Sequence, residues 1–452
     1  MVVTFVLGIL IIPAIVINGE FSDTHDAKID LLLKKLNKPA VKSIKSPYGG
    51  IIDCVHMKNH PIYDHPLFKN HTIQMKPSGD HDKWNNDTLN IDDESIVTQL
   101  WTINGKCPQN TIPIRRTTRE DILRAESIES YGKKYPNNIP RRKPANSTNE
   151  IHEYATLRVN GIFRGAEAVI NVWKPYVQMP REFSLAQMWL EAGPPSNLNT
   201  IEFGWQVYPG RYGDDNARFF VYWTADGYRS GCYNLDCPGF VPVNQAYVLG
   251  EPIGHDPRTG NWWLKLNHHV FIGYWPSILF NHLRNGATDI TWGGEITNYR
   301  VNLQHTMTNM GSGGFASEGY ERASYFRKLK IYDECNTWKP IHDRVPEYFI
   351  TQESCYNIRY AYETDWGDYF FYGGPGRNLC NYAIISHLCY FPPSYSVSDL
   401  QERKRNQKRV NFQNKNMNRK ESTLTWEKGE PGYDALRRVR DENEVQGEIE
   451  IV

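Results

Sequence analysis

The chain has 452 residues with 51 basic and 51 acidic side chains, so its formal net charge is zero. Balanced charge gives no support for binding to nucleic acid or to an anionic membrane surface. The length allows two or three domains, and the 27 Tyr, 18 Phe, 13 Trp and 34 Gly residues favour half-buried strands over a helical bundle.

The chain opens with an apolar run. Residues 2–17 carry almost only apolar side chains, and Asn18, Gly19 and Glu20 follow. This pattern predicts a secretory signal peptide over residues 1–19 and therefore a secreted, extracellular protein. The alternative is a membrane anchor, but the run is shorter than the roughly 20 residues that a spanning helix needs. No membrane partner is therefore expected.

The cysteine count fits a secreted protein, in which cysteines pair as disulfides. The eight cysteines are Cys54, Cys107, Cys232, Cys237, Cys335, Cys355, Cys380 and Cys389. Cys54 and Cys107 are the only two before residue 230, so we predict that they pair. No Cys/His cluster has zinc-finger spacing, and the His268–His269 pair is expected to be structural, so neither a metal nor another cofactor is expected.

Residues 20–125 are predicted to form a small mixed domain of helices and strands. The leucine-rich segment that begins at residue 26 has apolar side chains at helical spacing, which predicts a short amphipathic helix ended by Pro39. A second helix is expected after Thr117 or Thr118, either of which suits an N-cap. Acidic residues then follow in its first turn, at the positive end of the helix dipole.

Residues 126–150 are predicted to form a linker, because they are polar, basic and proline-containing and have no apolar periodicity. Exposed segments of this kind are where proteases cut. A removable N-terminal domain before such a linker indicates a zymogen, whose own pro-domain acts as its inhibitor. An ordinary hinge between two domains is the alternative.

Short strand-like segments fill residues 151–392. They are HEYATLRVNG, AEAVINVWKP, FSLAQMWLEAG, TIEFGWQVYP, RFFVYWTADGY, NWWLKLNHHVFIGYWP and TDITWGGEITN. Their regular spacing by turns, without long helices between them, predicts an antiparallel β-sandwich and a mainly β protein. Residues 277–286 are the exception and suit a short helix. Residues 393–452 are highly charged and poor in aromatics, which predicts a disordered tail.

Two of these strands carry one glutamate each, and side chains alternate between the faces of a strand. In IEFGWQV, Glu202 shares a face with Gly204 and Gln206, and the opposite face carries Ile201, Phe203, Trp205 and Val207. In DITWGGEITN, Glu295 shares a face with Thr291, Gly293 and Thr297, and the opposite face carries Ile290, Trp292 and Ile296. Two carboxylates beside glycines on a sheet predict an open, polar groove where a polypeptide or a sugar could lie.

Glu202 and Glu295 are therefore the candidate catalytic residues. Two nearby carboxyls can share one proton in mild acid, because like charges at close range push their pKa values apart. The ionised carboxylate takes a proton from water as the water attacks a carbonyl, and the protonated carboxyl donates to the oxyanion or the leaving nitrogen. Glycines leave room for a substrate backbone. The expected substrate-binding residues are Gly204, Gly293, Gly294 and Gln206.

A glutamate on an amphipathic strand usually belongs to a solvated face, so further motifs are needed to support a catalytic pair. One ordered set comprises IIDCV, HPLFKNHTIQMKPS and GKCPQNTIPIRRTTREDILRA. A second comprises QMWLEAG, IEFGWQV, FFVYWTADGY, GCYNLDCPGF, GNWWLKL, IGYWPSILFNHL, WGGEI and FYGGPGRN. Together they resemble neprosin, a plant family of glutamic endopeptidases, with its activation peptide, and the resemblance covers roughly residues 26–392.

The resemblance implies an activation peptide over residues 20–125 and a β-sandwich catalytic domain over residues 151–392. It implies that Glu202 and Glu295 are the catalytic pair and that no metal is used. It also implies a secreted zymogen that cleaves proline-containing polypeptides after proline in acid. Two disulfides follow from the family pattern, Cys232–Cys237 and Cys355–Cys380. Cys335 and Cys389 lie outside that pattern, and whether they pair is left open.

The segment 243–258 is shorter than the family's usual segment before GNWWL, which suggests a missing strand or loop beside the site. This favours an alternative function, a non-catalytic extracellular sandwich that binds cell-wall polysaccharide through aromatic side chains. A glycoside hydrolase is a third interpretation, because such enzymes also use two carboxyls. A serine hydrolase is not favoured, because the chain has no G-x-S-x-G motif.

Overall fold

The computed structural model describes residues 18–77, 99–134, 150–245, 247–248, 253–255, 261–266, 270–377 and 447–451. Most of the predicted signal peptide lies outside these ranges, and its last two residues begin the first helix, α1 (Asn18–Leu36). No helix within the described ranges combines the length and the apolar character needed to cross a membrane. The helix ends before Pro39 as predicted, but it begins earlier than the leucine periodicity indicates.

The N-terminal part is the expected small mixed domain. Its antiparallel sheet has the order β1 (Ala40–Lys45), β2 (Ile51–His56) and β3 (Thr111–Arg115). Helix α2 (Arg119–Leu123) begins after Thr118, whose hydroxyl accepts a hydrogen bond from the Asp121 N–H at 3.1 Å. The Asp121 carboxylate in turn accepts one from the Thr118 N–H at 2.8 Å. This reciprocal pair identifies Thr118, not Thr117, as the N-cap.

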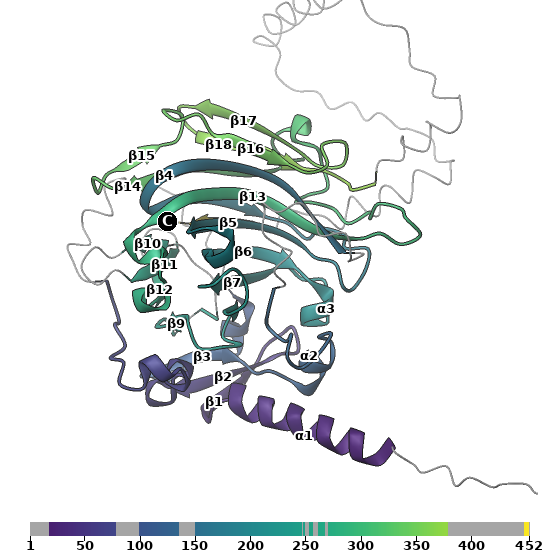
Figure 1. Cartoon of the computed structure of the whole chain (residues 1–452), viewed down its shortest axis with the longest axis vertical. Helices are drawn as coiled ribbons and strands as arrows, with labels where there is room; N and C mark the ends of the chain where they lie inside the picture. Colours follow the sequence, from purple (N-terminus) through teal and green to yellow (C-terminus); the bar gives the residue numbers. More distant parts are fainter. Residues whose placement is uncertain are drawn as a thin grey trace, which may run out of the picture. The chain divides into compact units, whose positions relative to one another are not determined.

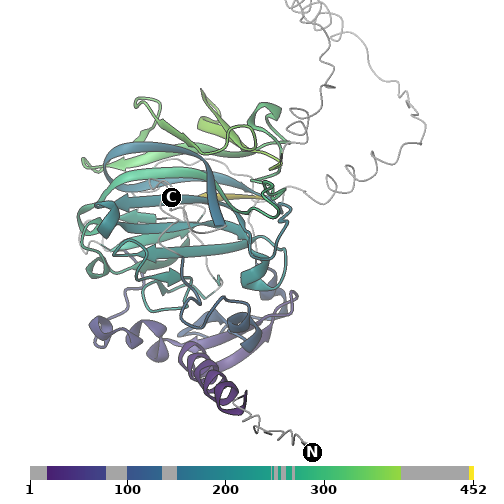
Figure 2. The same cartoon turned by 45° about the vertical axis from the view of Figure 1, so that its right-hand side comes forward.

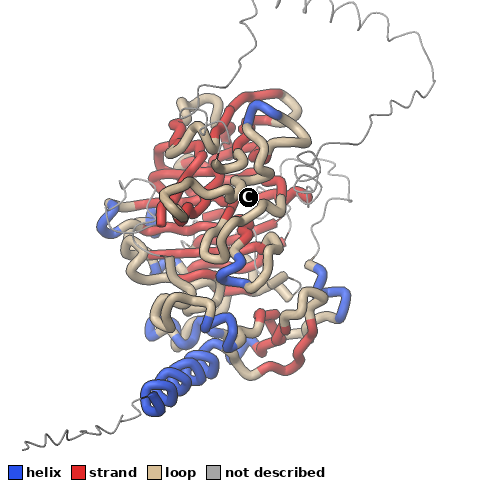
Figure 3. The backbone as a smooth tube through the Cα atoms, turned by 90° about the vertical axis from the view of Figure 1, so that its right-hand side faces the viewer, coloured by secondary structure: helices blue, strands red, loops and turns tan. Residues whose placement is uncertain are grey.

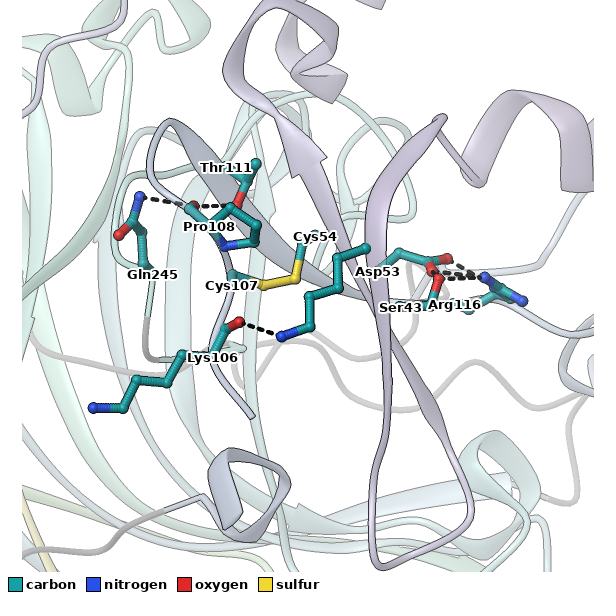
Figure 4. The surroundings of a disulfide bond; sticks show 10 residues. Ser43, Asp53, Cys54, Lys106, Cys107, Pro108, Thr111, Arg116 and Gln245 are labelled. Atoms are coloured by element: carbon teal, nitrogen blue, oxygen red, sulfur yellow. Dashed lines mark hydrogen bonds and ion pairs between the residues drawn. A yellow bond between two sulfur atoms is a disulfide. The ribbon is translucent and has the colours of Figure 1, made fainter. Parts of the chain in front are cut away.

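Cys54 and Cys107 form the predicted disulfide, which ties β2 to the segment that leads into β3 (Figure 4). Beside it, the Arg116 guanidinium donates to both carboxylate oxygens of Asp53, at 2.6 and 2.7 Å. The cysteines are 53 positions apart, and closing a loop of that length stabilises the fold by about 4 kcal/mol through the entropy of the unfolded chain. The bond therefore holds together a domain with a small core.

Three short 3-10 turns follow β2 and carry the chain toward the next domain. They are η1 (Met57–Asn59), η2 (Pro61–Asp64) and η3 (Pro66–Phe68). The remaining 3-10 turns are η6 (Leu100–Asn104), η8 (Pro195–Asn197), η9 (Ser277–Leu279), η10 (Leu283–Asn285) and η11 (Ala316–Glu318). Apart from α1 and α2, the described α-helical residues form the single turn α3 (Pro209–Tyr212).

Residues 150–377 form the predicted antiparallel β-sandwich, and strands make up most of it (Figure 3). One layer has the strand order β8, β7, β6, β5, β13 and β4. Figure 1 shows the five from β7 to β4 in this sequence. The bounds are β4 (Glu150–Val172), β5 (Ser184–Ala192), β6 (Asn199–Val207), β7 (Arg218–Thr224), β8 (Cys232–Tyr233) and β13 (Ala287–Tyr299). These neighbouring strands run side by side in the turned view as well (Figure 2).

The second layer continues from β4 in both directions. The strands here are β9 (Val241–Pro242), β10 (Ile253–His255), β11 (Trp262–Leu266), β12 (Val270–Trp275), β14 (Ser324–Asp333), β15 (Trp338–Pro340), β17 (Asn357–Glu363), β18 (Gly367–Gly373) and β19 (Gly447–Ile451). Strand β16 (Glu347–Ile350) pairs instead with the first part of β4 and extends the first layer. Strand β18 pairs with β14 and β17, whereas β11 pairs with β10 and β12. The apolar core lies between the layers and includes Trp205, Trp292 and Phe326.

Strand β4 joins the two layers and corrects the sequence prediction. The sequence predicts two strands separated by the glycines near residues 161–165, but the structure has one strand of 23 residues. Its first part pairs with β13, and its second part pairs with β14. Both ladders are irregular close to Phe163, where the partners change. Glycines in a strand permit such a bend, so they redirect the strand and do not end it.

The predicted helix over residues 277–286 is also absent, and the turns η9 and η10 take its place. Strand side chains bind the backbone groups that a helix would use internally. Asn199 Oδ1 accepts from the His282 N–H at 2.7 Å, and the Trp262 ring N–H donates to the Leu283 carbonyl at 2.9 Å. Tertiary contacts therefore override the local helical preference.

The end of the chain gives a further correction. Residues 378–446 of the predicted tail lie outside the described ranges, but Gly447–Ile451 form strand β19 and are not disordered. This strand pairs with β4 from Val172 to Ala168 and with β11 at Leu266. The short β10 pairs with the same two strands, at Gly165 of β4 and further along β11. The two short strands β10 and β19 thus pair with different parts of the same two strands, β4 and β11.

Candidate active site

Strand β5 places both candidate glutamates on one face of the sheet. It pairs with β6 on one side and with β13 on the other. Trp189 of β5 lies opposite Glu202, and Leu185 lies opposite Glu295. Directly opposed residues share a face, and Leu185 and Trp189 are four residues apart on one strand, so the two glutamates point the same way. The alternation predicted for both strands is therefore confirmed, with Trp205 and Trp292 in the core on the other face.

Glu202 is fully buried and collects four hydrogen-bond donors. Gln187 Nε2 donates to its Oε2 at 3.1 Å, and Thr200 Oγ1 donates to its Oε1 at 2.9 Å. The Tyr228 hydroxyl donates to Oε1 at 2.6 Å. The fourth donor is the Lys134 ammonium, which forms an ion pair with Oε2. A buried carboxylate needs such donors because they replace the water that burial removes.

Glu295 is 2% exposed and is held by two donors that both bind its Oε1 atom. His152 Nδ1 lies 2.6 Å from Oε1, and the Tyr154 hydroxyl donates to the same oxygen at 3.2 Å. His152 and Tyr154 are two residues apart on β4, and Tyr154 lies opposite Glu295 of β13. Both side chains therefore lie on the same face of the sheet as Glu295. No hydrogen bond from the described residues reaches Oε2.

The charges of both carboxylates contribute to the raised pKa values of two tyrosines, Tyr154 and Tyr233. Burial, followed by the charge of Glu295 and a hydrogen bond to it, raises the pKa of Tyr154 well above its usual value, and Glu202 adds to the shift. Burial raises the pKa of Tyr233 in the same direction, with smaller contributions from Glu295 and Glu202. Both hydroxyls thus stay protonated. Both phenols lie within electrostatic range of the two carboxylates.

Lys134 comes from the segment before the sandwich, and its side chain is 3% exposed. Its ammonium lies 5.0 Å from the ring centroid of Tyr222 and 5.5 Å from that of Tyr233, with Phe220 at 5.8 Å. These rings provide cation–π contacts to a charge that has left water. Lys134 therefore occupies an aromatic pocket beside Glu202.

Backbone contacts fix the segment that carries Lys134. The Tyr233 N–H donates to the Gly132 carbonyl at 2.8 Å, and the Lys134 N–H donates to the Tyr222 hydroxyl at 3.3 Å. Gly132 has a φ of +77°, and a Cβ there would lie 2.6 Å from the Asp236 side chain. Only glycine fits this conformation and this close approach.

The open groove that the sequence predicts is not present in this form of the protein. Glu202 and Glu295 are both buried, because Lys134 and a cluster of apolar side chains, most of them aromatic, cover the face that carries them. The cluster consists of Tyr154, Phe183, Leu185, Trp189, Leu198, Phe220, Tyr222, Tyr228 and Tyr233. The structure thus contains a closed site.

The predicted substrate-binding residues lie in different places. Gly204 and Gly293 flank Gln187 on the glutamate face. A Cβ on Gly204 would lie 2.0 Å from the Ala186 carbonyl oxygen, so this glycine permits close strand approach. Gln206 is on the same face but is buried, and its amide donates to the Tyr212 hydroxyl at 2.9 Å. The prediction that Gly294 binds substrate is wrong. Gly294 faces Met310 and Tyr372 in the core, because the alternation of the strand turns it away from the face that carries Glu295.

Cys232 and Cys237 form the disulfide that the family pattern implies. The predicted Cys355–Cys380 bond is not formed. The Cys355 thiol is free and buried, and it contacts the imidazole of His305, while Cys380 lies outside the described residues. Cys335 is free and exposed, and its possible partner Cys389 also lies outside the described residues.

Sequence reasoning missed several residues around the two glutamates. Tyr154 and His152 could have been found, since the H-x-Y spacing in HEYATL places both side chains on one face of a strand. No sequence pattern pointed to Tyr228 or Lys134. Tyr228 lies in a turn and Lys134 in the predicted linker, and neither segment has an apolar periodicity that would orient its side chains. Across the described residues, no group of three or more His, Cys, Asp or Glu side chains is arranged to hold a metal ion.

Comparisons with known proteins match both halves of the chain. The family model described as Neprosin activation peptide matches residues 43–158, and the model described as Neprosin matches residues 180–375. The first match includes Lys134 and His152. Among solved structures, the chain resembles "Crystal structure of Scytalido-glutamic peptidase with a peptide based transition state analog", with 9% identity and a TM-score of 0.27. That match covers 50% of this chain and 99% of the other, and it is too distant to carry an argument.

Proposed function

This chain belongs to the neprosin family, and from that premise we propose that it is the secreted precursor of a glutamic endopeptidase. The mature enzyme hydrolyses peptide bonds after proline in acid. The observation that carries the proposal is the pair of buried carboxylates, Glu202 and Glu295, on one face of the sandwich, with Lys134 of the N-terminal segment bound to one of them. A catalytic pair and its inhibitor would have this arrangement.

The reaction needs one carboxylate and one carboxylic acid. The carboxylate takes a proton from a water molecule whose oxygen attacks the peptide carbonyl carbon, and the carboxylic acid gives its proton to the amide nitrogen as the C–N bond breaks. Two close carboxyls hold a single proton in mild acid, because their mutual repulsion disfavours the doubly ionised state. Activity should therefore be confined to acid pH.

Latency follows from the Lys134–Glu202 ion pair. While the ammonium neutralises Glu202 and fills the space beside it, neither a water molecule nor a peptide can take that place. Protonation of Glu202 removes the attraction, and the ammonium then remains in an apolar pocket without a counter-charge. Acid thus favours withdrawal of the segment and opening of the site.

The pocket that Lys134 vacates suits a proline side chain. Phe220, Tyr222 and Tyr233 surround it and would offer their faces to a pyrrolidine ring. The two disulfides that the structure contains support folding in an oxidising compartment and hence secretion.

The full chain tests the proposal. It is incubated over a range of acid pH with a peptide that contains one internal proline, and mass spectrometry follows both the peptide and the precursor. We expect loss of the N-terminal segment, cleavage after proline, and no cleavage near neutral pH. A folded protein that cleaves no peptide over the whole acid range would refute the proposal and would favour a non-catalytic binding module.

A further inference from the structure

The environment of His152 connects this histidine to the chemistry of Glu295. The two side chains are 5% and 2% exposed, and Nδ1 of the imidazole lies 2.6 Å from Oε1 of the carboxylate. A carboxylate oxygen only accepts, so Nδ1 carries the hydrogen of this bond. Short bonds between a buried donor and a carboxylate are among the stronger contacts in proteins.

Two aromatic rings determine how the imidazole is oriented. The Tyr154 ring stacks on it, with a centroid distance of 6.4 Å and an interplanar angle of 24°. The Phe183 ring approaches it at an angle of 61° with a centroid distance of 5.7 Å. Titratable groups that contact it or its neighbouring ring include Glu295 on β13, Tyr154 on its own strand and Tyr208, which packs against Phe183. Glu295 is therefore its carboxylate partner.

The two oxygens of Glu295 differ in their contacts. Both donors, His152 and Tyr154, bind Oε1, and no donor among the described residues binds Oε2. The carboxylate is thus anchored through one oxygen and keeps the other for a new partner. A general base requires this asymmetry, because the lone pair that receives the proton must be unoccupied and correctly aimed.

We propose that His152 is a positioning residue for Glu295, which it holds through Oε1 so that Oε2 can take a proton from the attacking water. This inference rests on the proposed function. When the imidazole is protonated it also favours the ionised carboxylate, since an adjacent positive charge stabilises the negative form. Glu295 is then the base, and Glu202 supplies the proton to the leaving nitrogen.

Two substitutions separate positioning from packing. His152→Phe keeps an aromatic ring between Tyr154 and Phe183 but removes the donor. His152→Asn places an amide N–H near the position of Nδ1 and restores a neutral donor. We expect kcat to fall by up to about a hundred-fold in His152→Phe with little change in KM, because misplacing a catalytic group by about 1 Å has an effect of that size. His152→Asn should recover part of the loss.

The pH profile provides a readout that lost packing would not change. His152→Phe removes a hydrogen bond to the carboxylate that acts as base, and that bond favours the ionised form, so the acid limb of the kcat profile should move to higher pH in this variant. Unchanged kcat and an unchanged acid limb in both variants would overturn the inference. Equal losses in both variants, with an unmoved limb and lower thermal stability, would do the same, since they indicate a packing role.

A second readout does not require activity. In protein with 13C-labelled glutamate carboxyls, the Glu295 signal is assigned by its disappearance in Glu295→Gln. At a fixed acid pH, its chemical shift should differ between His152→Phe and the parent chain, because the hydrogen bond to Oε1 is lost. A changed chemical shift in a chain that cleaves no peptide would reject the proposed function and keep the inference. An unchanged chemical shift in an active enzyme would reject the inference alone.

Discussion

Glu202 illustrates how single residues keep the site closed. Its carboxylate is buried with three neutral donors, Gln187, Thr200 and Tyr228, and with the Lys134 ammonium. Removing one partner of a buried ion pair commonly costs about 3–5 kcal/mol, because the other charge is left uncompensated. Here the neutral donors remain, so Glu202 tolerates the loss of Lys134 better than Lys134 would tolerate the loss of Glu202.

We therefore predict that Lys134→Met weakens latency and leaves the sandwich folded. Methionine fills the aromatic pocket without a charge, so the segment before residue 135 should leave the site more readily. In acid, the parent precursor should cleave a peptide only after a lag in which its N-terminal segment is removed. The variant should show a shorter lag, measured by the fluorescence of a quenched peptide.

Lys133→Met is the matched control, because Lys133 is the exposed neighbour of Lys134. It should retain the lag of the parent chain. If Lys134→Met and Lys133→Met show the same lag, the ion pair does not cause latency.

Some residues of the site could be predicted from the sequence, and others could not. The faces that carry Glu202 and Glu295 could be predicted, because a strand alternates with a period of two and each segment contains enough apolar residues to show it. Lys134 could not be predicted, because its contact crosses 68 positions and lies in a segment without periodicity. The orientation of Gly294 was also predictable from alternation, but it was expected to bind substrate because it is a glycine next to Glu295.

Among the elements, the turns η1, η2 and η3 share an unusual feature. Each begins with a histidine whose Nδ1 accepts a backbone N–H two residues ahead, and the three histidines are His56, His60 and His65. A histidine can accept at Nδ1 only when that nitrogen carries no proton. Each of these hydrogen bonds therefore exists only while Nδ1 carries no proton, and burial lowers the pKa of His60 and of His65.

His60 is the most constrained of the three. It is 1% exposed, accepts from the Ile62 N–H at 3.0 Å, and places Nε2 at 3.3 Å from the Pro242 carbonyl of β9. Burial lowers its pKa from 6.5 to about 3; the bond to Pro242 opposes the shift, and His71 adds slightly to it. The other titratable ring near it is Tyr63.

We predict that acid weakens the folded precursor through His60. Its folded pKa lies below its unfolded value of 6.5, so the folded state binds fewer protons. The stability that it contributes is complete above pH 6.5 and is lost as the pH falls toward 3. The slope is at most about 1.4 kcal/mol per pH unit.

His60→Asn tests this prediction, because asparagine is a good N-cap and does not titrate. Urea unfolding at pH 7 and pH 4.5 is compared in a Glu295→Gln background, which prevents self-cleavage. The loss of stability in acid should be smaller in His60→Asn than in the background chain. His56→Asn, at a similar cap with a more exposed imidazole, should change the acid loss little. An equal acid loss in all three proteins would contradict the assignment.

The elements themselves were partly predictable. Hydrophobic alternation located most strands of the sandwich, but β4 was predicted as two strands because glycine signals both turns and bends. The helix expected over residues 277–286 failed for a different reason. Its backbone groups bind Asn199 and Trp262 from distant strands, and no local pattern records those partners.

For the whole molecule, strand β19 links the end of the chain to the sandwich. It pairs with β4 opposite β14, which is the other neighbour of β4 in the same region. Without β19, the backbone of β4 from Ala168 to Val172 would lack one of its two ladders. Among the described residues of segment 243–258, those of β10 pair at this strand position, through Gly254 and Gly165 of β4, whereas the C-terminal residues pair with β4 from Ala168 to Val172.

We predict that deletion of residues 447–452 destabilises the sandwich. Loss of the ladder exposes the edge of β4, and hydrogen exchange should accelerate at the amides of residues 168–172. Thermal unfolding should shift downward by about 2–4 °C for each kcal/mol lost. Deletion of six residues within 420–440 controls for the shortened chain and should leave both measurements unchanged. Unaltered exchange at residues 168–172 after the 447–452 deletion would show that β19 does not support β4.

The organisation of the whole molecule could be predicted only in part from composition and from the order of the motifs. The change from a small mixed part to a β-sandwich was predictable because strand spacing changes near residue 150, and the structure has a separate three-stranded sheet before that residue. The pairing of β19 was not, since its highly charged surroundings indicate disorder and its partners lie more than 180 residues away.

The most direct test of the central claim is the cleavage rate of Glu202→Gln and Glu295→Gln. Both variants are purified as folded precursors, their N-terminal segments are removed by an added protease, and each is assayed in acid on a peptide with one internal proline. Glu167→Gln serves as control, because Glu167 is another buried glutamate of the sandwich that pairs with a lysine, Lys330 at 3.4 Å. We predict that both site variants lose at least about 100-fold in kcat, the usual contribution of a general acid or base, while Glu167→Gln remains active. Parent-like cleavage by either folded site variant would contradict the claim that Glu202 and Glu295 are the catalytic pair.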